Sequence, residues 1–373
     1  MNYKQCRRCV MDNKSDTSIM FDDKGFCNYC SQALKVKDKV YFPNKEGAIK
    51  LENLLNKIKN DNIGEQYDCL MGISGGLDSS YLAYLGAEKW GLRILAIHIN
   101  DGFNSDVSQR NIERISKFPN LDMKTIHIDN EQYAELIKAF MRSGVPNITM
   151  PQDNILFANL YKFVKEYKVK TLLSGFNFAL ESILQKDNIH PYLDLKNIMH
   201  IQKLFGKGKI DKLEFISRLK ADLDYAFLRF ERYSPLDYVD FDKNKALEEL
   251  SDYCGFEYYG EKHQENEFTK FGLQYWMYYR NNVDIRTSYL SSLIVSGQMS
   301  REEALKELSN QPYTDEDIQR TISSVLAKIN MTKDEFDTIF NQPLKQHSDY
   351  ETSSNSIFIR AMLKMLRLTR DRS

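Results

Sequence analysis

Residues 67–91, with the sequence YDCLMGISGGLDSSYLAYLGAEKWG, decide the fold of this chain. The apolar run that ends at Ile73 predicts a buried strand, and the amphipathic pattern after Ser79 predicts a helix. Between them, Gly75 and Gly76 allow a tight turn and a close approach to a ligand, because no Cβ stands in the way. Amides at the start of the helix attract anions. The stretch therefore predicts a phosphate-binding turn, which is not a Walker loop because no Gly-Lys-Ser/Thr follows.

The residue types in this turn suggest roles in binding a nucleotide. The backbone amides of residues 75–79 and the hydroxyls of Ser74 and Ser79 suit the pyrophosphate of ATP. Asp78 repels phosphate, so it either holds Mg²⁺ or caps the helix. His98 lies in an apolar run and is either a nucleotide contact or a core histidine. The predicted ATP-binding residues are Ser74, Gly75, Gly76, Asp78, Ser79, Ser80, His98 and Gly175.

Strands and helices alternate after this turn. The sequence predicts strands at 93–100, 123–128 and 170–174, and helices at 106–117, 131–142 and 154–167. This alternation indicates an α/β fold with a doubly wound parallel sheet, in which ligands bind beyond the carboxyl ends of the strands. Each predicted strand ends in polar or glycine-rich residues, so we expect one shared site there. Asn177 and Glu181 follow the last of these strands and are predicted to reach the second substrate.

Two CxxC pairs near the N-terminus predict a metal site. Cys6-x2-Cys9 and Cys27-x2-Cys30 are separated by residues 10–26, a spacing of 17 that is typical of zinc ribbons. Each pair places two thiolates on one tight turn, and two such turns complete a tetrahedron. Four cysteines leave no coordination position open, so we expect a structural zinc ion, with an iron–sulfur cluster as the alternative. The segment between the pairs has few apolar residues and is expected to need its metal to fold.

The composition is that of a soluble globular protein. Of the 373 residues, 42% are hydrophobic and 28% are charged, and the formal net charge is −1. This balance does not support broad nucleic-acid binding. No apolar run approaches the roughly 20 residues that span a membrane, and the first residues contain no signal-peptide core. We therefore expect a cytoplasmic protein that binds neither nucleic acid nor membrane.

Two stretches carry a resemblance to known families. The string SGGLDSS at 74–80 resembles the PP-loop of the ATP pyrophosphatases, which have the adenine nucleotide alpha hydrolase-like fold. Residues 258–307, with LSSLIVSGQMSREEAL near their end, together with the four cysteines, resemble the N-acetyl sugar amidotransferases of bacterial surface-sugar biosynthesis. Two positions depart from that family's pattern. Asn266 replaces the serine of a KHxES-like segment, and Tyr289 replaces a frequent histidine. Both departures bear on which sugar is accepted.

The resemblance implies an ATP-dependent C–N ligase that releases AMP and pyrophosphate. The oxygen of a sugar acetamido group is adenylated, and ammonia replaces it to give an acetamidino sugar for lipopolysaccharide or flagellin, such as a pseudaminic-type sugar. His263 is the implied general base. The implied catalytic residues are Asp78, His263 and Glu265, and the implied sugar-binding residues are Asn177, Glu181, Lys262 and Arg286. A salt-bridged structural face is the alternative for the charged cluster at 262–270.

The resemblance also implies a partner. Cys69 and Cys254 lie in apolar settings, so no cysteine-based glutaminase is expected. Ammonia would come from free ammonium or from a separate glutamine amidotransferase subunit, possibly with a cyclase-like companion. The regions expected are a zinc-binding module at 1–43, a linker helix at 44–66, the PP-loop domain at 67–235 and a mostly helical substrate or partner region at 236–373.

Two other functions are compatible with some of the same motifs. A PP-loop tRNA sulfur-transferase also combines CxxC pairs with a PP-loop, but it usually needs further cysteines near ATP and a basic face. This chain has 51 Lys and Arg against 52 Asp and Glu, and no further CxxC pair. A non-catalytic partner module is the second alternative, and the intact SGGLDS argues against it.

Overall fold

The structure, a computed structural model, describes residues 2–186, 188–260, 264–311 and 313–353. Lys262 and His263, two residues of the predicted site, lie outside the described residues. Within these ranges, no helix combines the length and apolar character needed to cross a bilayer.

A five-stranded parallel sheet forms the centre of the chain. Its strands, in the order β3-β2-β1-β4-β5, are β1 (Cys69–Gly72), β2 (Ile94–Asn100), β3 (Leu121–His127), β4 (Thr171–Leu173) and β5 (Glu231–Tyr233). The predicted doubly wound parallel sheet is confirmed. The edge strand β5 is not among the predicted strands. A three-residue edge strand is too short to show a period, and it is recognised only by its pairing with β4.

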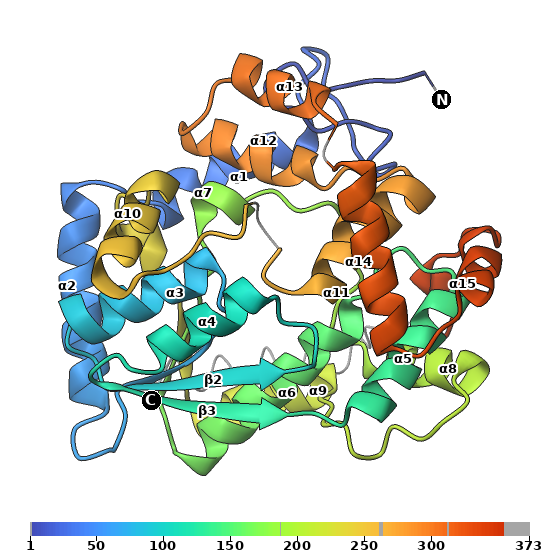
Figure 1. Ribbon diagram of the computed structural model, residues 1–373. Helices are drawn as coiled ribbons and strands as arrows, with labels where there is room; N and C mark the ends of the chain where they lie inside the picture. Colours follow the sequence, from blue (N-terminus) through green and yellow to red (C-terminus); the bar gives the residue numbers. More distant parts are fainter. Residues whose placement is uncertain (1, 187, 261–263, 312, 354–373) are drawn as a thin grey trace.

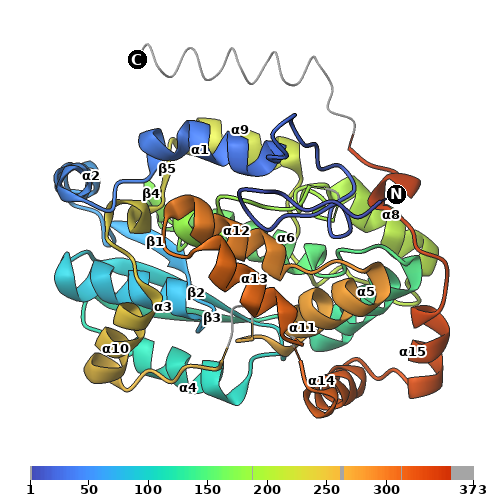
Figure 2. The same cartoon turned by 90° about the horizontal axis from the view of Figure 1, so that it is seen from above.

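Helices cover both faces of the sheet (Figure 2). One layer contains α3 (Leu77–Tyr84), α4 (Asp106–Ile115) and α10 (Lys243–Cys254), and the other contains α6 (Met150–Glu166) and α9 (Arg218–Leu228). In β2, Ile94 and Ala96 pack toward the first layer, whereas Leu95 and Ile97 pack toward the second. Because successive strand residues point to opposite faces, an unbroken apolar strand is buried on both sides. The predicted linker helix, α2 (Lys45–Asp61), joins the first layer.

A helical region lies beyond the ends of β2 and β3 (Figure 1). It is built around Phe140 and Trp276, whose indole nitrogen donates to the carbonyl of Val145 at 2.9 Å. Its elements are α5 (Asn130–Ser143), α8 (Leu195–Phe205), α11 (Glu267–Lys270), the π-helix η3 (Phe271–Arg280), α14 (Asp315–Lys328) and α15 (Lys333–Phe340). This second core positions α11, and the residue before it, against the end of the sheet.

The cysteine-containing N-terminal segment and α1 (Asn28–Val40) pack on helices from distant parts of the chain (Figure 1). These helices are α7 (Phe178–Glu181), α12 (Arg286–Ser296) and α13 (Arg301–Ser309). Lys37 donates to the carbonyl of Val295 at 2.8 Å, and Arg301 donates to that of Cys6 at 2.9 Å. The N-terminal module therefore supports α12, which in turn contacts α7 next to the end of β4. The short elements η1 (Leu85–Lys89), η2 (Pro235–Tyr238) and η4 (His347–Asp349) complete the structure.

Candidate functional site

The strand order changes direction between β1 and β4, the point at which open α/β sheets form a crevice. The chain runs from β1 toward β2 and β3 on one side, and from β4 toward β5 on the other. Ligands of open α/β sheets bind at such a point, beyond the carboxyl ends of the strands. The two loops that leave these strands touch each other. A Cβ added to Gly175 would lie 3.2 Å from the amide nitrogen of Ser79 and 3.3 Å from the carbonyl carbon of Asp78.

The turn after β1 has the conformation that its glycines predict. Gly75 has a φ of +78°, and a Cβ there would lie 2.6 Å from the hydroxyl of Ser108 on α4. That hydroxyl donates to the carbonyl of Ser74 at 3.0 Å and fixes the turn. Gly76 is the N-cap residue of α3, with no side chain to bond the first-turn amides. Asp78 lies inside the first turn, so it is not the N-cap residue, and the capping alternative for Asp78 is not favoured.

The three serines of the motif differ in their surroundings. Ser74 is exposed, and its hydroxyl lies 3.3 Å from that of Ser79 and accepts from the amide of Gly76 at 3.2 Å. Ser80 is fully buried and donates to the carbonyl of Gly76 at 2.6 Å. Ser74 and Ser79 therefore form the hydroxyl pair at the turn, whereas the hydroxyl of Ser80 is used within the helix.

The second half of the chain brings Glu265 to this turn. A Cβ on Gly76 would lie 3.1 Å from the carboxyl carbon of Glu265 and 3.0 Å from the hydroxyl of Tyr259. The amide of Ser105 donates to the carbonyl of Glu265 at 2.9 Å. The Tyr259 hydroxyl accepts from the amide of Leu77 at 3.0 Å, and burial raises its pKa far above the ordinary value. Sequence reasoning missed Tyr259, because one tyrosine in an aromatic-rich stretch gives no distinguishing signal.

Asp101, at the end of β2, anchors the segment that carries Glu265. Its two carboxylate oxygens each accept from the side-chain amide of Asn266 at 3.0 Å, and one also accepts from Gln152 at 2.8 Å. Burial raises the pKa of Asp101. Asn266 is one of the two departures from the family pattern, and here it joins the sheet to the N-terminus of α11, where it accepts from the amide of Thr269.

His98 is buried below the turn. Its Nδ1 donates to the carbonyl of Ile73 at 2.9 Å, and its Nε2 accepts from the side-chain amide of Asn104 at 2.9 Å. Burial lowers the pKa of the imidazole, which is consistent with this neutral tautomer. Because both ring nitrogens are engaged inside the protein, the core-histidine alternative is favoured over a direct contact with ATP. His98 holds the backbone from which the turn begins.

The residues after β4 form the opposite wall. Asn177 is fully buried and caps α7 by accepting from the amide of Leu180 at 2.9 Å. Its side-chain nitrogen has no hydrogen-bond partner among the described residues. Asp237 accepts from the amide of Phe178 at 2.6 Å. Burial, with a further contribution from the charge of Glu181, raises the pKa of Asp237 to about 6. The predicted Asn177 and Glu181 are thus brought to the β4 side of the crevice, next to an acid that sequence reasoning missed.

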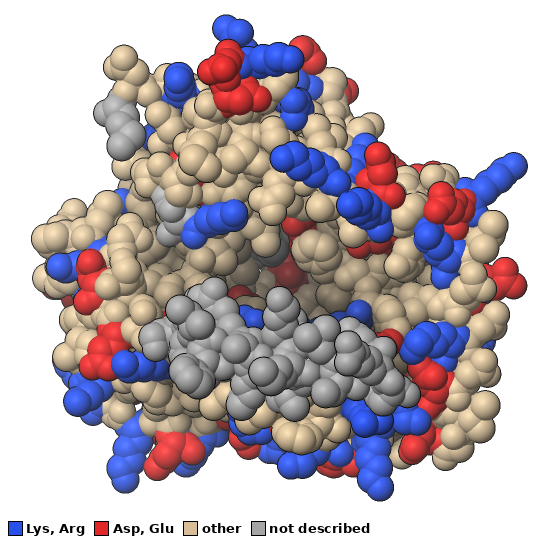
Figure 3. Space-filling model, turned by 180° about the vertical axis from the view of Figure 1, so that it is seen from behind, with Lys and Arg blue, Asp and Glu red and all other residues tan. Residues whose placement is uncertain are grey.

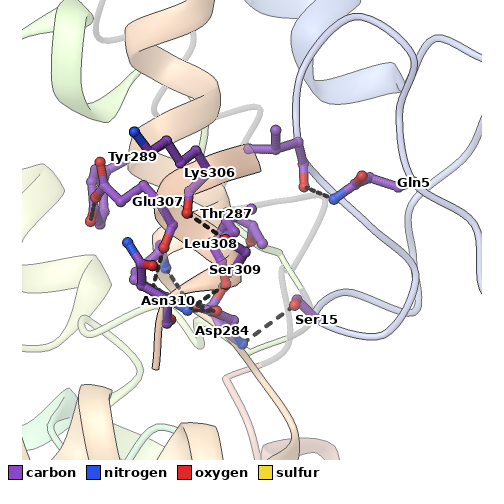
Figure 4. A network of polar contacts seen from close by, with 12 residues as sticks. Gln5, Ser15, Asp284, Thr287, Tyr289, Lys306, Glu307, Leu308, Ser309 and Asn310 are labelled. Carbon is purple, nitrogen blue, oxygen red and sulfur yellow. Dashed lines mark hydrogen bonds and ion pairs between the residues drawn. The ribbon is translucent and has the colours of Figure 1, made fainter. Parts of the chain in front are cut away.

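Arg286 has a structural environment. Figure 4 shows its partners Asp284, Glu307, Leu308 and Asn310 close together in one polar network. It pairs with Asp284 at 2.8 Å and donates to the carbonyls of Glu307, Leu308 and Asn310 at the end of α13. Its side chain is 5% exposed. Tyr289, the other departure from the family pattern, donates to Glu307 at 2.7 Å in the same contact. The guanidinium therefore satisfies carbonyls at a helix C-terminus, and the predicted role in sugar binding is not favoured.

The four N-terminal cysteines fit a metal ion. All four are fully buried, and their sulfur atoms lie within 4.8 Å of one another. Cys6 and Cys30 have sulfurs 3.8 Å apart, and those of Cys9 and Cys27 are 3.6 Å apart. Metal–sulfur bonds of about 2.3 Å, as zinc forms, give a tetrahedron with edges of about 3.8 Å. The amides of Arg8 and Cys27 donate to the sulfur of Cys6, which suits a thiolate ligand.

Comparison with known proteins identifies part of the chain. Residues 265–366 match the family described as "LPS biosynthesis protein WbpG-like, C-terminal domain". This region is similar to that family. The match begins at Glu265, the residue that lies against Gly76, and it confirms over this region the resemblance to surface-sugar biosynthesis enzymes that the motifs predict.

Other similarities are more distant. An uncharacterised protein of Methanocaldococcus jannaschii, MJ1599, is 24% identical over 172 residues, which is 46% of this chain and 58% of that protein. An NMN synthetase from Francisella tularensis shares 16% identity with a TM-score of 0.31, over 81% of this chain and 97% of that one. An NH₃-dependent NAD synthetase from Campylobacter jejuni shares 13% identity with a TM-score of 0.30, over 72% and 98%. At these TM-scores neither structure bears on the function of this chain.

Proposed function

We propose that this protein is an ATP-dependent amidotransferase, a C–N ligase that converts the acetamido group of an N-acetyl sugar into an acetamidino group. The observation that carries the proposal is the glycine turn between β1 and α3, which faces the β4 loop and has Glu265 of the WbpG-like region against it. This arrangement places an anion-binding helix start, two carboxylates and the second half of the chain at one crevice.

The reaction follows from the chemistry of an amide. The amide oxygen is a poor leaving group, so it first attacks the α-phosphorus of ATP, and pyrophosphate leaves. Ammonia then adds to the activated carbon, and AMP departs with the former amide oxygen. In the proposal, the amides at 75–79 with Ser74 and Ser79 hold the pyrophosphate, while the carboxylates of Asp78 and Glu265 suit Mg²⁺. The cysteine cluster holds a structural zinc ion that supports α12 and α13.

The ammonia is proposed to come from outside this chain. Burial raises the thiol pKa of both Cys69 and Cys254, so neither has the thiolate character that a glutaminase nucleophile needs. A glutamine amidotransferase subunit, possibly with a cyclase-like companion, or free ammonium would supply it. The same two thiols give no support to a tRNA sulfur-transferase. A flagellin or lipopolysaccharide sugar of the pseudaminic type remains a proposal for the acceptor.

The test is a product assay on the metal-loaded protein with ATP, Mg²⁺, ammonium and a panel of N-acetyl sugars. The expected products are AMP, pyrophosphate and a sugar whose mass reflects exchange of oxygen for NH. Asp78→Ala should lose this turnover and keep its metal content, whereas Asp106→Asn, a carboxylate change in the first turn of α4, should keep both. Formation of ADP, or no sugar product with any acceptor, would contradict the proposal.

A further inference from the structure

Tyr259 brings a phenol from the second half of the chain to the start of α3. Its hydroxyl accepts from the amide of Leu77, the first residue of α3, at 3.0 Å. The same oxygen would lie 3.0 Å from a Cβ on Gly76, and so would the hydroxyl oxygen of Ser74. Two hydroxyls from distant parts of the chain therefore converge on the glycine at which the anion-binding helix begins.

The segment before Tyr259 is fixed to α4. The side chain of Asn111, which is fully buried, accepts from the amide of Glu257 at 2.9 Å and donates to the carbonyl of the same residue at 2.8 Å. Its amide nitrogen also comes within 3.5 Å of the carbonyl oxygen of Gly75. One helix therefore holds both the glycine turn and the backbone that leads to Tyr259, so the position of the phenol relative to the turn is built into the fold.

Further bonds hold this part of the chain at two points. The carboxylate of Glu257 pairs with both Arg110 and Arg114 of α4. On the other side of Tyr259, the carbonyl of Glu265 accepts from the amide of Ser105 at 2.9 Å, just before α4 begins. The residues on either side of the phenol are thus bound to the same loop and helix.

The phenol of Tyr259 is kept in its neutral, donating form. An N–H group cannot accept a hydrogen bond, so the hydroxyl proton is directed to a group other than the Leu77 amide. Burial and the nearby charges of Glu265 and Asp78 raise the pKa of Tyr259 far above its ordinary value. At neutral pH the hydroxyl therefore keeps its proton and offers one hydrogen bond.

Acidic groups lie close to the turn. The charges of both Glu265 and Asp78 act on the Tyr259 hydroxyl. On the face opposite to that of Figure 1, the molecule is hollowed at its centre, and acidic side chains are visible inside the hollow (Figure 3). A polyphosphate near carboxylates is repelled unless a cation or uncharged donors offset their charge. Backbone amides, the serine hydroxyls and a neutral phenol are donors of this kind.

We propose that Tyr259 is a further residue of the ATP site, and that its hydroxyl donates a hydrogen bond to a phosphate oxygen in the pyrophosphate portion of ATP. The Leu77 amide, which the hydroxyl occupies, then supports the phosphate through Tyr259. No proton is transferred. When the bond from the α-phosphorus breaks, pyrophosphate leaves with the bonding electrons, and the hydrogen bond stabilises the added negative charge. That the bound anion is the pyrophosphate of ATP rests on the proposed function.

A purely structural role for Tyr259 predicts the opposite effect on binding. If the hydroxyl only capped α3, it would satisfy one of the amides that a helix start leaves unpaired. Its removal would then free the Leu77 amide for phosphate, and an anion would bind equally well or more tightly. If the hydroxyl donates to phosphate, its removal weakens anion binding. The sign of the change in affinity therefore decides between the two roles.

Titration calorimetry with inorganic pyrophosphate and Mg²⁺, without ATP or sugar, measures this sign on the metal-loaded protein. Tyr259→Phe removes only the hydroxyl and should weaken pyrophosphate binding about tenfold or more, because a hydrogen bond to a charged group is lost. Tyr253→Phe is the control, since that ring packs on Tyr84 at the far end of α3, and it should bind as the wild type does. Equal or tighter binding by Tyr259→Phe would overturn the proposal.

A second variant decides the question if melting curves and metal content show that Tyr259→Phe does not fold. Glu257→Gln keeps the hydroxyl but weakens the ion pairs that hold its segment to α4. It should reduce the affinity for pyrophosphate about threefold or more. Glu113→Gln, the same change at an exposed position of α4, should not. Wild-type affinity in Glu257→Gln would then count against the proposal.

The outcomes separate this inference from the proposed function. If AMP and an acetamidino sugar form but Tyr259→Phe binds pyrophosphate as the wild type does, the role of Tyr259 is wrong and the proposed function stands. If pyrophosphate binding depends on Tyr259 but no N-acetyl sugar gives an acetamidino product, the reverse holds. A wild-type protein that binds neither pyrophosphate nor ATP would contradict both.

Discussion

Replacing Arg286 with glutamine tests whether this residue binds the sugar, as the sequence resemblance implies, or stabilises the fold, as the structure indicates. In the structure, its guanidinium pairs with Asp284 and donates to three carbonyls at the end of α13, with only 5% of the side chain exposed. Removing one partner of a buried, hydrogen-bonded ion pair costs about 3–5 kcal/mol, because the other groups stay buried without partners. We therefore expect Arg286→Gln to act on stability.

The expected loss can be converted into a melting temperature. An unfolding entropy of about 2.1 cal/mol/K per residue gives about 0.8 kcal/mol/K for the 373-residue chain, if it unfolds as one unit. A loss of 3–5 kcal/mol then lowers Tm by about 4–6 °C. Arg320→Gln is the matched control. It removes an arginine that is 77% exposed and paired with Asp317, and it should cost no more than about 1 kcal/mol.

The assay is differential scanning calorimetry of both variants, combined with acceptor binding at a temperature where both are folded. Arg286→Gln should melt early and bind the acceptor with unchanged affinity. A variant with the wild-type Tm and a clearly weaker affinity for the acceptor would refute the structural account. That result would instead support the sugar-binding role of Arg286 that the resemblance implies.

Three further predictions concern the metal, the turn and pH. Cys9→Ser should reduce bound metal from about one equivalent to near none and lower Tm, as elemental analysis and melting would show; full metal content would argue against four-sulfur coordination. Gly175→Ala should weaken ATP binding about tenfold or more, because its Cβ would press on the Ser79 amide at 3.2 Å, whereas Gly72→Ala, with its nearest contact at 3.7 Å, should not. For Asp237, with a pKa raised to about 6, stability falls as the pH rises from about 4 to above 6, since the folded state holds the proton more tightly. Asp237→Asn should remove this fall, by at most about 3 kcal/mol between pH 4 and 8 in urea unfolding, and a pH-independent difference from the wild type would contradict it.

The elements that carry strong local signals were predictable. The buried run before the turn, the positive φ required of Gly75 and the capping box at Ser300 and Glu303 each follow from a few neighbouring residues, and the structure has all three. The strand β5 was not predictable. Three residues are too few to show a hydrophobic period, and this segment is a strand only because it pairs with the edge of β4. The zinc-ribbon spacing predicted the ligand set, but not that Arg301 would bond the backbone of its first knuckle.

The sequence by itself determined three local features: a glycine turn before a helix, a set of four cysteines with metal-binding spacing, and a C-terminal region similar to a lipopolysaccharide-biosynthesis family. These are local patterns, in which residue type and spacing are sufficient. Only the tertiary structure decided which distant residues serve the site. Glu265 reaches the turn because its segment bonds to the end of β2, whereas Arg286 is drawn to the carbonyls of a helix end. The sequence gives the charge of each side chain, but the packing of the helices and strands decides which group that side chain binds.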